Sequence, residues 1–131
     1  MRFTENELTK AVTAAAKTIV AAQRQVRKDK RDVDEVWDAM TQYQRFQFLD
    51  GVGDQILAVL VALPDVEVEI GTRPTFTDAQ IRDTVESTVG SDLGRVRRAA
   101  TIVARVALVK SALAGVPPRQ DPDALIVPDH L

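Results

Sequence analysis

The chain has 131 residues, of which 45% are hydrophobic and 27% charged, and this length and composition predict one folded domain with a single core. It contains no cysteine, which excludes a disulfide framework, a thiolate nucleophile and a zinc site of the usual sulfur type. The longest apolar run, residues 56–63, is too short to cross a bilayer, and the first ten residues lack the apolar run of a secretory signal. We therefore expect a cytoplasmic protein with no membrane partner.

The net charge of -2 conceals a separation of the charges into blocks. Residues 1–31 carry eight basic and three acidic residues, whereas residues 32–92 carry three basic and thirteen acidic residues. Residues 93–119 carry six basic residues and no acidic one, and the remaining residues carry three acids and no Lys or Arg. Such blocks favour attraction either between segments of one monomer or between copies of the chain. Both interpretations stay open at this point.

The first helix is predicted to begin at Thr4. Thr4 and Glu7 have the spacing of a capping box, in which each side chain accepts a hydrogen bond from the other residue's backbone N–H. Apolar residues then recur three and four positions apart, which is typical of a helix that packs in a bundle. This seam consists of Leu8, Val12, Ala15, Ile19, Ala22 and Val26. The basic run over residues 24–31 is predicted to close the helix, because cations suit the negative end of the helix dipole.

A second helix is predicted from Asp32, an N-cap residue that is followed by Glu35. Its apolar side chains are Val33, Val36, Trp37, Met40, Tyr43 and Phe46. Gly51 and Gly53 are predicted to interrupt the helix, and Asp54 then caps a short apolar helix that ends at residue 63. Because aromatic side chains bury the most area, we expect the core to lie here. The expected core residues are Trp37, Met40, Phe46, Ile56, Leu60 and Val103.

An extended connector is predicted over residues 66–76. Residues 66–70 alternate apolar and acidic side chains, which is the period of a strand with one buried face. No partner strand is evident in the chain. The segment is therefore either a linker packed along the body or an edge that pairs with another chain.

Two further helices are predicted after the connector. Thr77 and Gln80 form another capping box, and the helix that they begin ends at Gly90. Ser91 or Asp92 is then expected to cap a last helix that runs to about residue 114. The aliphatic residues in its second half are predicted to be buried. Four arginines lie in its first half or at its middle: Arg95, Arg97, Arg98 and Arg105.

We divide the chain into a helical bundle domain over residues 1–115 and an extended arm over residues 116–131. The arm contains four prolines and cannot form a regular element. Its one apolar cluster consists of Leu125, Ile126 and Val127, and we expect these residues to bind a groove of the same chain, of another copy or of a partner.

The sequence contains no recognisable catalytic motif. Its single histidine, His130, is next to the last residue, where no neighbouring groups could orient it. This excludes nucleophilic catalysis of the Ser–His or Cys–His kind. There is also no Glu-x-x-His pair and no EF-hand loop. We therefore expect a protein that is not an enzyme and that has no cofactor, metal or small-molecule ligand.

The alternative function is a DNA-binding regulator. Residues 77–105 resemble a helix-turn-helix with Val96 inside the second helix and exposed arginines before and after it. The candidate nucleic-acid contacts are Arg95, Arg97 and Arg98. Against this interpretation stand Glu86, where the motif has a small residue, and a pI of about 5.4. A helical hairpin in a bundle explains the same residues, so nucleic acid is not the favoured partner.

Three segments of the chain are similar to small proteins encoded by actinobacteria and their phages. They read TENELTKAV, DVEVEIGTRPTFTDAQI and RQDPDALIVPDHL. The resemblance implies a source and no activity. The sequence as a whole predicts an all-α bundle of about five helices with one extended connector and an ordered, proline-rich arm. The predicted function is non-catalytic protein–protein interaction or assembly, with a homo-oligomer expected. The charge blocks, the unpaired extended segment and the apolar cluster of the arm favour this function, of which a phage structural or host-interacting component, located in the virion, is one form.

Overall fold

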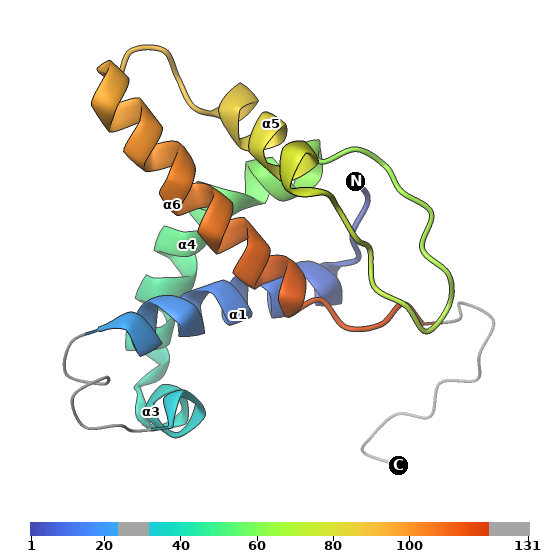
Figure 1. The fold of residues 1–131 in the computed structure, drawn as a ribbon. Coiled ribbons are helices and arrows are strands. Elements are labelled where there is room, and N and C mark those ends of the chain that lie inside the picture. The colour runs from blue at the N-terminus through green and yellow to red at the C-terminus, as the bar shows by residue number, and fades with distance from the viewer. Residues whose placement is uncertain (24–31, 121–131) are drawn as a thin grey trace.

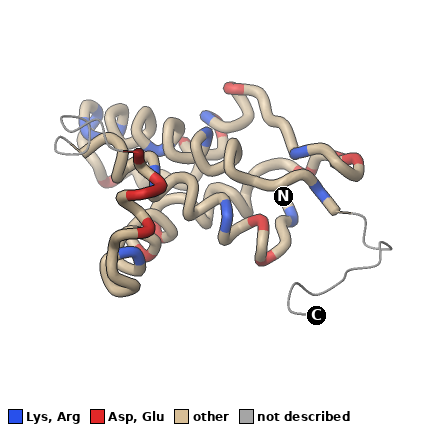
Figure 2. The backbone as a smooth tube through the Cα atoms, turned by 90° about the horizontal axis from the view of Figure 1, so that it is seen from below, with Lys and Arg blue, Asp and Glu red and all other residues tan. Residues whose placement is uncertain are grey.

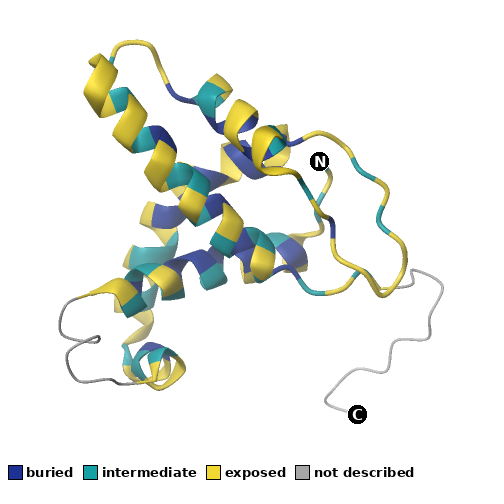
Figure 3. Ribbon diagram, in the orientation of Figure 1, coloured by how far each residue is buried: buried dark blue, intermediate teal, exposed yellow. Residues whose placement is uncertain are grey.

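The computed structural model describes residues 1–23 and 32–120. These residues form five helices and no strand, so the predicted all-α class is confirmed for them (Figure 1). The helices are α1 (Glu5–Ala22), α3 (Val33–Ala39), α4 (Gln42–Ala62), α5 (Asp78–Thr88) and α6 (Arg95–Ala114). Helix α1 contacts α3, α4 and α6, and α5 packs against α4 and α6. Figure 3 shows the buried positions gathered where α1, α4 and α6 meet.

Helix α1 begins with the predicted capping box. The backbone N–H of Glu7 donates to Thr4 Oγ1 at 3.1 Å, and the backbone N–H of Thr4 donates to Glu7 Oε1 at 2.8 Å. The face that packs into the core is built mostly of small residues, which are Ala11, Val12, Ala15, Ala16 and Val20. The expected continuation of this helix through Val26 and the basic run lies outside the described residues.

The small residues of α1 allow the end of α6 to approach closely. A Cβ atom on Gly115, the residue that ends α6, would overlap the Cβ of Ala14 and lie 3.1 Å from the backbone oxygen of Lys10. The next residue, Val116, is fully buried. Glycine is therefore required at position 115 by the distance between two helices, not by an unusual backbone angle.

The predicted helix boundary between residues 32 and 63 is wrong. The interruption lies at Met40 and Thr41, where Thr41 and Gln44 form a capping box, and α4 then continues through both glycines to Ala62. Each glycine inside a helix costs about 1 kcal/mol relative to alanine. The burial of Ile56 and four neighbours on the same face outweighs this cost.

This shift of the boundary turns two aromatic side chains outward. Tyr43 is 68% exposed and Phe46 is 59% exposed, so the prediction that Phe46 belongs to the core is wrong. Val103 is also exposed, which contradicts a second core prediction. Three other expected core residues are confirmed as buried, and they are Trp37, Ile56 and Leu60. Met40 is half-buried and packs against the core.

The connector is an extended linker held to the body of the same chain. The backbone N–H of Gly71 donates to the carbonyl of Arg119 at 2.8 Å, and the N–H of Arg119 donates to the carbonyl of Thr72, also at 2.8 Å. These two bonds join the connector to the first residues of the predicted arm. Residues 66–70 form no strand in the structure, and their pairing with another chain stays a prediction.

Helices α5 and α6 lie side by side with antiparallel directions (Figure 1). The predicted capping box at Thr77 and Gln80 begins α5. Neither Ser91 nor Asp92 caps α6, which is a correction to the sequence-based expectation: the N-cap is Gly94, and it makes no side-chain hydrogen bond.

Candidate interaction surface

The first turn of α6 presents charge and apolar surface together. Arg95 and Arg97 are exposed, whereas Arg98 is half-buried and its Nη2 donates to the backbone carbonyl of Glu86 at 3.2 Å. Val96, which the helix-turn-helix interpretation placed inside, is 83% exposed. That expectation is wrong because α6 packs through a different face, the one that carries Ile102, Val109 and Ala112.

A cavity of about 490 Å³ lies between α5 and the first half of α6. Three arginines line it, and only one acidic side chain, Glu86, does so. Glu86 accepts from Arg82 Nε at 3.1 Å, which leaves the cavity with an excess of positive charge. Its apolar lining includes Ile102 and Val103. This end of the molecule is therefore basic, with aliphatic side chains between the charges.

A second exposed apolar surface runs along α4. Its members recur at spacings of three and four residues, so they lie on one side of the helix. We name these residues the α4 stripe: Tyr43, Phe46, Asp50, Asp54, Leu57 and Val61. All six are exposed, and the two aspartates lie at the middle of the stripe.

The α4 stripe lies opposite the core face of the same helix. The core face carries Val52, Ile56, Val59 and Leu60, all at most 2% exposed. A helix that is apolar on both sides is normally covered on both sides. Large apolar side chains rarely gather on the open surface of a monomer, and where they do they mark an interaction site.

An apolar groove of about 340 Å³ adjoins this stripe. Helix α1 contributes Leu8 and Val12, and α4 contributes Leu49 and Leu57. Leu57 belongs to both the groove and the α4 stripe. The exposed apolar surface of α4 therefore continues onto α1.

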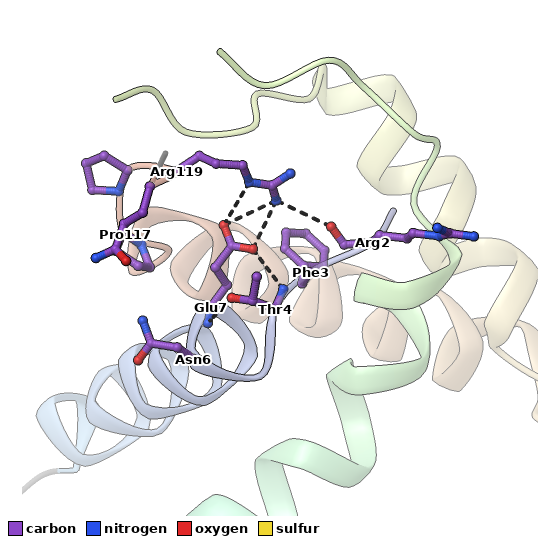
Figure 4. Close-up of a pocket in the computed structure, with 9 residues that line it drawn as sticks. Arg2, Phe3, Thr4, Asn6, Glu7, Pro117 and Arg119 are labelled. Atoms are coloured by element: carbon purple, nitrogen blue, oxygen red, sulfur yellow. Dashed lines mark hydrogen bonds and ion pairs between the residues drawn. The ribbon is translucent and has the colours of Figure 1, made fainter. Parts of the chain in front are cut away.

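A further cavity, of about 520 Å³, lies beside Arg119 at the start of α1 (Figure 4). Its buried carboxylate, Glu7, is already paired: Arg119 Nη2 lies 3.0 Å from Oε1 and 3.2 Å from Oε2. Oε1 also accepts the N–H of Thr4. Both oxygens of this carboxylate are therefore hydrogen-bonded within the chain, and Glu7 joins the segment after α6 to the start of α1.

The charges of the chain follow one another in blocks, and Figure 2 shows acidic positions succeeding each other along part of the tube.

Within residues 1–23 and 32–120, no three His, Asp or Glu side chains converge as metal ligands would. No helix in this part of the chain is long and apolar enough to cross a membrane.

The sequence-predicted site residues have different outcomes. Leu125, Ile126 and Val127 lie outside the described residues, so their role as partner-binding residues stays a prediction. The α4 stripe was missed, because Tyr43 and Phe46 were assigned to the core. The signal that could have found it is the recurrence of apolar residues on two sides of one long helix.

The chain matches no protein-family model, no curated protein and no solved structure. The resemblance to proteins of actinobacteria and their phages therefore stays a prediction.

Proposed function

We propose that the protein is a non-catalytic interaction protein that assembles with other copies of its own chain. The observation that carries this proposal is the α4 stripe, a row of exposed aromatic and aliphatic side chains about 27 Å long at 1.5 Å per residue. A phage structural or host-interacting role is one form of this function.

The stripe can support a specific contact of moderate strength. Four large apolar side chains on it retain 40 to 68% of their surface. Covering them would contribute on the order of 4 kcal/mol, from which the loss of freedom on association must be subtracted. The four side chains therefore cannot set the affinity alone, and the adjoining groove on α1 and the surface covered on the second copy must contribute as well.

Sedimentation velocity on the full chain tests the proposal. The average mass should rise between about 5 and about 300 µM protein, a range that brackets a dissociation constant of tens of micromolar. The double variant Tyr43→Ser, Phe46→Ser should remain monomeric over this range and keep its helical circular dichroism.

Ile70→Ser is the matched control, because Ile70 is 62% exposed but lies in the connector, away from α4. This variant should associate like the wild type. A wild-type protein that is monomeric at every concentration, or an equal loss in the Ile70→Ser control, would contradict the proposal.

Duplex DNA binding is the second candidate, and the exposure of Arg95 and Arg97 on one helix turn favours it. We expect no retention of labelled duplex at low micromolar protein and moderate salt. If DNA binding is the function, the affinity falls steeply with salt and is lost when Arg95, Arg97 and Arg98 are all replaced by alanine.

A further inference from the structure

We propose that the outer face of α6 of a second copy packs on the α4 stripe, with its first turn at the acidic middle and the rest of α6 along the half that carries Tyr43 and Phe46. This inference rests on the proposed function and names the two surfaces that meet. The α4 stripe is apolar with two aspartates at its middle. The outer face of α6 is apolar with arginines at its N-terminal end, so the two surfaces are complementary in charge.

The charges on the α4 stripe oppose the simplest alternative, which is two α4 helices packed against each other around a twofold axis. Asp50 and Asp54 lie near the midpoint between Tyr43 and Val61. In an antiparallel α4 pair they would face the same two aspartates of the second copy. Four carboxylates would then lie together in a contact from which water is excluded, and this is strongly unfavourable.

The outer face of α6 has the complementary character. Val96 and Val103 are separated by seven residues, so they lie on the same side of the helix, and both are exposed. The exposed residues on that side between and just after them are alanines, at positions 99, 100 and 107, and the next one is Lys110, which is paired with Asp78 at 2.8 Å. Small side chains leave room for the large side chains of a facing helix, as ridges fit into grooves. Tyr43 and Phe46 are such side chains.

The charge beside this face matches the aspartates of α4. Arg95 and Arg97 are exposed and flank Val96, and the whole segment 93–119 contains no acidic residue. An arginine placed opposite an aspartate in an apolar contact favours the correct pairing and speeds the encounter. The same positive charge would repel a second α6, so α6 pairs with α4 rather than with itself.

A charge-reversal experiment on the full chain tests this pairing. One variant carries Asp50→Arg and Asp54→Arg, and the other carries Arg95→Asp and Arg97→Asp. All four positions are exposed, and an aspartate in the first turn of α6 suits the positive end of the helix dipole, so both variants should fold.

Each variant alone should associate at least about tenfold more weakly than the wild type, because it places like charges in contact. An equimolar mixture should recover the wild-type association, since each α4 then meets an α6 of opposite charge. Glu67→Arg with Glu69→Arg is the matched control. It makes the same change in net charge as the α4 variant, within the exposed part of the connector, and should leave association unchanged.

The outcomes separate this inference from the proposed function. If the α6 variant associates like the wild type while the Tyr43 and Phe46 variant does not, α4 has another occupant: assembly stands and the α4–α6 pairing is overturned. The α4–α6 pairing is also overturned, and assembly still stands, if both charge variants associate more weakly than the wild type and their mixture does not recover the wild-type association. If the wild type never associates, the proposed function itself fails.

Discussion

Glu7 is a buried carboxylate that joins two distant parts of the chain. Its side chain is only 5% exposed, and it contacts Arg119, 112 residues later in the sequence. Arg119 Nη2 also lies 3.4 Å from the backbone carbonyl of Arg2. The pair therefore holds the segment after α6 against the start of α1.

Removing one member of this pair should be costly. We expect Arg119→Ala to lower the free energy of unfolding by about 3 kcal/mol, because Glu7 would be left buried without its cation. Urea denaturation measures the change. The double variant Glu7→Gln, Arg119→Gln should lose less than the single variant, since no unpaired charge remains. A single variant as stable as the wild type would show that water reaches Glu7 freely.

The sequence could predict only one of the two roles of Glu7. The spacing from Thr4 identifies the capping box, which is a local pattern of four residues. The contact with Arg119 depends on how α1 and α6 cross, and no short-range pattern encodes it. The prediction that Trp37 is buried is confirmed. A large aromatic side chain on the apolar face of a short helix is expected to pack into the core, so the local sequence is enough to predict its burial.

At the scale of the helices, α1 and α6 are the pair whose spacing is most restricted. Gly115 ends α6 against the backbone of α1, whereas Gly51 lies inside α4 with nothing within 4 Å of where a Cβ would be. The same substitution should therefore have opposite effects at these two glycines.

We expect Gly115→Ala to destabilise the protein by about 1 to 3 kcal/mol, because the added methyl group pushes α6 away from Ala14. Gly51→Ala should stabilise it by about 0.5 to 1 kcal/mol, because alanine favours the helix and meets no neighbour. Thermal unfolding of both variants measures the contrast. If Gly115→Ala is also stabilising, the two helices are not in close contact at this point.

Sequence patterns located most helix starts but misplaced the break before α4. Capping boxes at Thr4 and Thr77 were found, whereas the one at Thr41 was overlooked in favour of Gly51 and Gly53. Glycine predicts a helix end less reliably than a capping box does where the buried face of the helix is strongly apolar. Once the break moves to Thr41, Tyr43 and Phe46 point away from the core, whereas Phe48 packs against it. Two expected core residues thus become part of a candidate interface.

At the scale of the whole molecule, the connector, the start of α1 and the residues after α6 form one set of contacts around Arg119. Its backbone bonds to Gly71 and Thr72, and its side chain bonds to Glu7. A truncation must therefore leave Arg119 in place if it is to test the apolar cluster of residues 125–127 separately from the stability of the bundle.

Two truncations separate these contributions. Removing residues 121–131 should leave the helical signal and the melting temperature unchanged, because the described contacts of Arg119 remain, while shifting the association equilibrium toward monomer if residues 125–127 bind another copy. Removing residues 119–131 should also lower the melting temperature, by about 10 °C, since it leaves Glu7 unpaired. Circular dichroism and sedimentation velocity measure the two effects. If the shorter truncation already melts early, residues 125–127 pack on their own bundle. If it changes neither property, the cluster binds no copy of the chain, and assembly depends on α4 alone.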